Sequence, residues 1–98
     1  MAKKKSYSKQ SSRETFYFKK GQQALDVAKL GKAVSYFEKI PKDSPHYGRA
    51  CKEKGAALLR FGHLSEALTA LQAAHRALPK DGAILVDGAD VARLMGHL

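Results

Sequence analysis

The 98-residue sequence contains one cysteine, Cys51, and no long uninterrupted apolar run. A single thiol excludes a disulfide within the chain and any zinc site built from cysteines. A helix needs about 18 consecutive apolar residues to cross a bilayer, and a secretory signal needs an apolar stretch of roughly 7 to 15 residues near the N-terminus. The sequence has neither, so we expect a cytoplasmic protein.

Acidic residues are also scarce, and none precedes Glu14. Eighteen Lys and Arg against nine Asp and Glu give a net charge of +9. The cations before Glu14 are Lys3, Lys4, Lys5, Lys9 and Arg13. Because this stretch is rich in serine and has almost no bulky apolar residue besides Tyr7, we predict a flexible, solvated basic tail over residues 1–12. Such a tail could bind nucleic-acid phosphates, with an affinity that falls as salt rises, or anionic lipid.

The sequence repeats itself after 34 residues. Under that shift Gly21 aligns with Gly55, Ala33 with Ala67 and Pro45 with Pro79, and the tripeptide that begins at Gly62 recurs at Gly96. A period of this length is typical of stacked helix pairs, in which successive copies share one core. Glycine inside a helix indicates a close approach of a second helix rather than a helix end.

Local signals predict about five helices. Ser11 and Glu14 have the spacing of a capping box, which places the first helix start near Ser12. A second helix follows a turn near Leu30, with an apolar face that ends at Ile40. A third runs from about Pro45 to Arg60, with Ser44 as its cap.

The fourth predicted helix begins at Leu64 and ends before Pro79, and the fifth covers residues 83–95. The fifth is apolar around most of its circumference, so we expect it to be buried on more than one side. Either the sequence is a fragment of a longer array of repeats, or this helix is a cap whose outer face meets another copy or another protein. Its exposed apolar area predicts self-association through Leu85, Val91 or Met95.

This pattern resembles the tetratricopeptide repeat, whose motif combines spaced aromatic, glycine, alanine and proline positions. The matching residues of the first copy are Tyr17, Gly21, Ala33, Phe37 and Pro45, and those of the second are Gly55, Ala67, Ala74 and Pro79. Departures from the motif are Lys20, Lys54, Ala24 and Ile40. Over a domain of residues 13–98, the copies would be residues 14–47 and 48–81, with residues 82–98 as the first helix of a third copy or a cap.

The resemblance implies an all-α fold, a right-handed solenoid of antiparallel helix pairs whose first helices line a concave groove. It implies that the protein binds a peptide or helical segment of a partner there. Aligning this sequence with the family's motif places the following residues in the groove: Phe18, Gln22, Leu25, Arg49, Lys52, Ala56, Leu59, Arg60, Val86, Asp90 and Arg93. Their mixture of basic and apolar groups suits an acidic, amphipathic partner.

No residue pattern indicates catalysis or a cofactor. The histidines at positions 46, 63, 75 and 97 match no metal-binding motif, and we interpret them as surface turn residues. Cys51 falls on a helix face that should be buried, which favours a structural thiol over a nucleophile. We therefore expect a non-enzymatic protein-interaction module with no metal or cofactor. The alternative is a nucleic-acid- or ribosome-associated protein anchored through Lys3 to Arg13.

Overall fold

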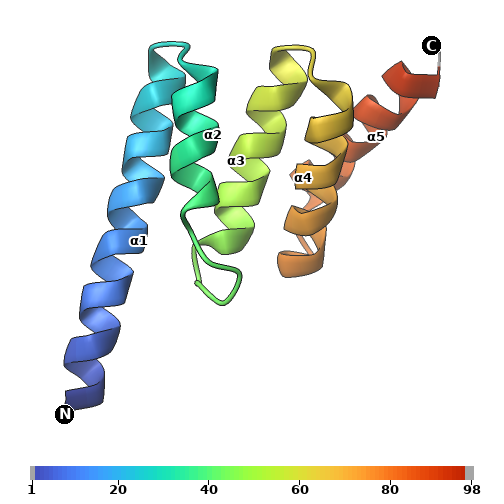
Figure 1. The fold of residues 1–98 in the computed structure, drawn as a ribbon. Coiled ribbons are helices and arrows are strands. Elements are labelled where there is room, and N and C mark those ends of the chain that lie inside the picture. The colour runs from blue at the N-terminus through green and yellow to red at the C-terminus, as the bar shows by residue number, and fades with distance from the viewer. Residues whose placement is uncertain (1, 97–98) are drawn as a thin grey trace.

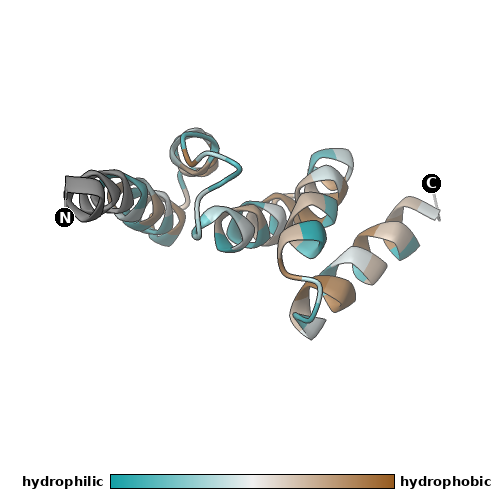
Figure 2. Ribbon diagram, turned by 90° about the horizontal axis from the view of Figure 1, so that it is seen from below, coloured by the Kyte–Doolittle hydropathy of each residue, from teal (hydrophilic) through white to brown (hydrophobic). Residues whose placement is uncertain are grey.

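The computed structural model describes the backbone of residues 2–96 and the side chains of residues 13–96, and this part of the chain is all-helical. Its five helices are α1 (Ala2–Asp26), α2 (Leu30–Glu38), α3 (Tyr47–Arg60), α4 (Leu64–Ala77) and α5 (Gly82–Gly96). Consecutive helices pack against one another, and α1 also contacts α3, which contacts α5 (Figure 1). Seen along the helices, α2 and α4 lie on one side of the molecule, and α1, α3 and α5 on the other (Figure 2).

The first helix is longer than the sequence analysis predicted. It begins at Ala2 rather than near Ser12, and it extends well past the end of α2 (Figure 1). Between Ala2 and Lys20 the sequence has no proline or glycine, the residues that interrupt helices most strongly. The predicted boundary between a tail of residues 1–12 and the helical domain therefore does not coincide with a helix start. Ser11 lies inside the helix, so the predicted capping box is wrong.

The 34-residue repeat corresponds to a repeated helix contact. A Cβ atom placed on Gly21 of α1 would lie 2.5 Å from the ring of Phe37 in α2. A Cβ atom on Gly55 of α3 would lie 2.7 Å from the Leu71 side chain in α4. Real Cβ atoms do not approach other atoms so closely, so each glycine makes room for one large side chain. The predicted role of these glycines in close packing is confirmed.

The turns that follow α1 and α3 are also equivalent. After α3, the Gly62 N–H donates to the Leu59 carbonyl (3.1 Å) and the His63 N–H to the Leu58 carbonyl (2.9 Å). This pair of bonds is the Schellman motif, and it needs a residue with positive φ, here Gly62 at 83°. After α1 the same two bonds form, but the positive-φ residue is Ala28, at 58°.

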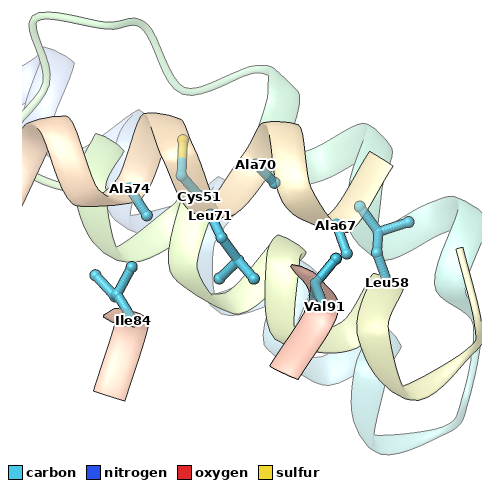
Figure 3. Close-up of a cluster of buried hydrophobic side chains, with 8 residues drawn as sticks. All are labelled: Cys51, Leu58, Ala67, Ala70, Leu71, Ala74, Ile84 and Val91. Atoms are coloured by element: carbon cyan, nitrogen blue, oxygen red, sulfur yellow. The ribbon is translucent and has the colours of Figure 1, made fainter. Parts of the chain in front are cut away.

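Two clusters of buried apolar side chains hold the helices together. The first joins α1, α2 and the start of α3 around Phe18, Phe37 and Ile40. The second joins α3, α4 and α5, with Ile84 and Val91 of α5 directed at the α3 and α4 side chains (Figure 3). Its buried members are Cys51, Leu58, Ala67, Ala70, Leu71, Ala74, Ile84 and Val91. The burial predicted for Cys51 is confirmed.

Helix α3 begins at Tyr47, two residues later than predicted. The predicted cap at Ser44 is wrong, because His46 directly precedes the helix and makes no capping bond with its side chain. The Ser44 hydroxyl instead accepts a hydrogen bond from the His46 N–H (3.0 Å) within the turn before the helix. Helices α4 and α5 lie where the sequence predicted them, within one or two residues.

Candidate functional site

The predicted groove residues lie on the three helices that share one side of the molecule. We call the surface formed by α1, α3 and α5 the first-helix face. Most of the predicted residues retain some exposure, but they differ in what their side chains already contact.

Phe18 is the clearest correction to the predicted groove. It is only 6% exposed and packs in the core, with its ring 5.8 Å from that of Phe37 and 6.2 Å from that of His46. An interior side chain of this kind cannot receive a partner. Helical register predicts that Phe18 lies on the side of α1 that faces α3. It does not show how closely these two helices approach, so the burial of Phe18 could not be predicted.

Arg49 covers Phe18 from the solvent side. Its guanidinium carbon lies 5.1 Å from the centroid of the Phe18 ring, within the range of a cation–π interaction. Arg49 is exposed, and among the described residues it has no ion-pair partner. The ring thus restricts the motion of the guanidinium, and the N–H groups of the guanidinium remain available as donors.

Lys52, the second predicted cation of this face, is already paired. Its Nζ lies 2.8 Å from Oδ2 of Asp81, which precedes α5. The hydrogen bond from Lys52 lowers the pKa of the Asp81 carboxyl, although partial burial opposes the shift. Asp81 also accepts a hydrogen bond from the Ala83 N–H (3.0 Å), so the pair ties α3 to the start of α5.

Apolar and cationic groups continue along the face. Leu25, Ala56 and Leu59 are half-buried, and Arg60 is exposed at the end of α3. Gln22, also half-buried, lies on the same helix as Leu25.

On α5, Val86 is exposed, whereas Asp90 pairs with Arg93 of the same helix at 2.8 Å. Of the four cations predicted in the groove, Lys52 and Arg93 are therefore paired, whereas Arg49 and Arg60 have no ion-pair partner within the described residues.

The residues of α5 that were predicted to mediate self-association differ in exposure. Val91 is fully buried against α3 and α4, so it cannot meet a second molecule. Met95 is half-buried and packs on the same cluster, and Leu85 is exposed.

A cleft that the sequence analysis did not predict opens on the other side, between α2 and α4. Three hollows of about 370, 400 and 210 Å³ follow α3, and the first shares lining residues with each of the other two. Lys42 and Tyr47 line the first two hollows, and Lys54 lines the first and third. A hydrogen bond with Cys51, together with burial, raises the pKa of the Tyr47 hydroxyl. The lining residues come from distant segments, so no local motif could have identified the cleft.

The histidines are more varied than predicted. His63 is an exposed residue before α4, as expected, but His46 is half-buried against Phe18 and bonded to Thr15 (3.2 Å). His75 lies within α4, where its buried Nδ1 has no hydrogen-bond partner among the residues that the structure describes. His97 lies outside the described residues. Over residues 2–96, no three His, Cys, Asp or Glu side chains gather as a group that could hold a metal ion.

Comparison with protein-family models, curated protein sequences and solved structures finds no match to this chain. No helix in the part of the chain that the structure describes combines the length and the hydropathy that a membrane span requires.

Proposed function

We propose that this protein is a non-enzymatic interaction module of the tetratricopeptide-repeat type, which binds an acidic segment of a protein partner on its first-helix face. Two observations support the repeat assignment: the equivalent contacts of Gly21 with Phe37 and of Gly55 with Leu71, and the equivalent turns after α1 and α3.

The position of Arg49 is the observation that carries this function. A guanidinium held over an aromatic ring loses little further side-chain freedom when it binds a carboxylate, and its planar donor groups match a carboxylate in two-pronged geometry. The phenyl ring of Phe18 lies 5.1 Å from the guanidinium carbon, and within the described residues no acceptor engages the guanidinium N–H groups. Phe18 therefore acts in this proposal as the support of Arg49 rather than as a contact residue.

Arg60 and the half-buried Leu59 extend the site along α3. Arg60 supplies a second positive charge, and Leu59 an apolar surface beside it. Positive groups at the rim of an interface mainly accelerate association and select against basic partners, whereas buried apolar contacts slow dissociation. A partner with alternating acidic and apolar side chains would use both.

A peptide-display selection with a random peptide library tests this proposal. The wild-type chain should enrich acidic sequences, and Arg49→Ala with Arg60→Ala should lose that enrichment. Lys32→Ala is the matched control, because Lys32 is an exposed cation on α2, in the other layer. Equal enrichment by the double variant, or no acidic preference in the wild type, would contradict the proposal. Unchanged thermal unfolding of both variants would show that the loss is not one of folding.

A further inference from the structure

Three aromatic side chains of the first hairpin have lysines over their rings. The Nζ of Lys39 lies 5.4 Å from the centroid of the Tyr17 ring and 5.6 Å from that of the Tyr36 ring. The Nζ of Lys20 lies 5.6 Å from the centroid of the Phe16 ring. The Phe16 and Tyr17 rings meet edge to face, with their centroids 5.9 Å apart. We call these five residues the lysine-aromatic patch.

The lysine-aromatic patch is accessible and positively charged. Phe16 is 52% exposed and Lys39 is also exposed, whereas Tyr17, Tyr36 and Lys20 are half-buried. Neither lysine has an ion-pair partner within the described residues. Accessible rings beside cations suit a ligand that combines planar groups with negative charge.

The packing that the two repeats share does not explain these rings. Adding 34 to Phe16 and to Tyr36 gives Ala50 and Ala70, which are 1% and 4% exposed. Ala50 packs in the cluster that joins α1, α2 and the start of α3, and Ala70 packs in the cluster of α3, α4 and α5. The second repeat therefore has small buried residues where the first repeat has large rings that reach solvent.

The cations differ between the repeats in the same way. Lys54, the equivalent of Lys20, pairs with Glu38 of α2 at 3.7 Å. That pair forms because α2 precedes α3 after a turn of residues 39–46. The equivalent residues 5–12 form no turn but continue α1, so the register that brings α2 against α3 is interrupted before the patch.

Helix α1 carries further cations beyond the patch. Its first part extends well past the end of α2 (Figure 1). Lys9 precedes Phe16 by two helical turns, or about 10 Å along the helix axis. The patch and the basic part of α1 therefore belong to one continuous element, whose further lysines are Lys3, Lys4 and Lys5.

From these observations we infer that the lysine-aromatic patch binds single-stranded nucleic acid, with a base stacked on Phe16 or Tyr36 and a neighbouring phosphate on Lys20 or Lys39. Aromatic faces bind unpaired bases with little regard to sequence, and cations beside them follow the backbone. Stacking of a base on a ring is stronger than an exposed cation–π contact. A base therefore displaces the lysine from the ring, and the released ammonium reaches the phosphate.

The rings distinguish this ligand from other anions. An acidic protein segment or an anionic lipid would satisfy the lysines, but neither supplies a planar group for each ring. A duplex keeps its base faces stacked on one another, so the patch should prefer single strands. None of the five residues belongs to the predicted groove, and the inference is therefore independent of the proposed function.

The test titrates the full chain into labelled single-stranded oligouridine and oligodeoxythymidine of about 12 nucleotides, within the usual site sizes of about 4–16. Fluorescence anisotropy follows binding, and the tighter of the two probes shows whether RNA or DNA is the preferred ligand. Phe16→Leu keeps an apolar side chain but removes the aromatic face, so it should weaken binding about tenfold. Phe16→Trp should bind at least as tightly as the wild type.

Salt dependence separates stacking from charge. The loss caused by Phe16→Leu should be the same at about 50 and 200 mM salt, because stacking releases no counterions. Lys20→Ala with Lys39→Ala should instead reduce the slope of log affinity against log salt. The chain has no tryptophan, so Phe16→Trp also introduces a single reporter, and its fluorescence should be quenched when a base stacks on it.

Phe61→Leu is the matched control, because Phe61 is 46% exposed directly after α3 and lies outside the patch. It should bind both probes as the wild type does. Equal binding by Phe16→Leu and the wild type would overturn the inference, since it would leave the cations alone as the binding groups. Failure of the wild type to bind either oligonucleotide, including when it binds phosphatidylserine vesicles, would overturn it as well. Unchanged thermal unfolding of Phe16→Leu would show that the loss of binding is not one of folding.

Discussion

Ser44 donates a hydrogen bond of 2.6 Å to Oε1 of Glu14, and both residues are buried. The same two positions in the second repeat are Leu78 and Gly48, and a Cβ atom on Gly48 would lie 2.7 Å from the Leu78 side chain. At these equivalent positions the first repeat therefore has a polar contact and the second repeat an apolar one. In the first repeat the hydrogen bond anchors the segment between α2 and α3 to α1.

Removing the Ser44 hydroxyl should destabilise the fold. Ser44→Ala leaves the buried Glu14 carboxyl without its partner, and a hydrogen bond to a charged group contributes about 1.5–3 kcal/mol. We expect urea unfolding to report a loss of that order. A double-mutant cycle with Glu14→Ala isolates the pair, and a coupling energy near zero would show that the two side chains do not stabilise each other.

The turn after α1 is strained, whereas its counterpart after α3 is not. Ala28 adopts a φ of 58°, a region that alanine disfavours by about 1 kcal/mol relative to glycine. Ala28→Gly should therefore stabilise the protein by about 0.5–1 kcal/mol, despite the added freedom of the unfolded chain. Gly62→Ala, the reverse change at the equivalent turn, should destabilise it by a similar amount. Shifts of the same sign in thermal unfolding would contradict this account.

The two close-packed glycines should resist any side chain. Gly21→Ala forces the Phe37 ring to move and Gly55→Ala forces Leu71 to move, and overpacking of this kind costs about 1–3 kcal/mol. Denaturant unfolding of both variants measures the loss. Adding Phe37→Leu to Gly21→Ala should restore part of it, because a smaller side chain makes room for the new methyl group. If Phe37→Leu makes the variant still less stable, the strain does not lie in this contact.

The Lys52–Asp81 pair predicts a pH-dependent contribution to stability. Lys52 lowers the Asp81 pKa in the folded state, so the unfolded state binds more protons as the pH falls toward that pKa. The stabilisation is complete above the unfolded pKa, about 4, and is lost as the pH falls through the lower folded value. The difference in urea midpoint between wild type and Lys52→Ala should therefore shrink on acidification from pH 7 to pH 3. A difference that is independent of pH would rule out this ion pair as its source.

Because Lys52 is paired with Asp81, a substitution of Lys52 is a poor test of partner binding. Lys52 is predicted as a free groove cation, but a glutamate at this position would face Asp81 and lower stability by charge repulsion. Arg49→Ala avoids this problem, since Arg49 has no acidic neighbour within the described residues.

The alternative function, anchoring to nucleic acid through Lys3 to Arg13, predicts salt-sensitive RNA binding. Each cation that contacts a phosphate adds to the slope of log affinity against log salt, so deleting residues 2–10 should remove most of that slope. Titration of the protein with RNA of mixed sequence at 50 and 200 mM salt measures this slope. Absence of binding by the full chain would eliminate this alternative.

Several features were predictable because their signals are local. The apolar spacing of α2 and α4 follows from residues close together along the chain. The 34-residue period and the matching glycines at positions 21 and 55 follow from aligning the sequence with itself. The start of α1 was missed because the Ser11–Glu14 spacing was interpreted as a cap, whereas the Glu14 side chain instead contacts a residue 30 positions away.

The groove was predicted only in part, for a related reason. Helical register indicates which side of a helix a residue occupies, but not how closely the next helix approaches it. Phe18 and Lys52 occupy equivalent positions in the two repeats, yet one is interior and the other pairs with Asp81.

The amino-acid pattern by itself determined that this chain forms a series of helix hairpins, because helix formation and small-residue spacing depend on near neighbours. Only the tertiary structure decided which side chains remain available to partners. Burial of Phe18, pairing of Lys52 and exposure of Leu85 each depend on which distant segment covers that residue, and contacts about 30 positions apart leave no mark in local periodicity.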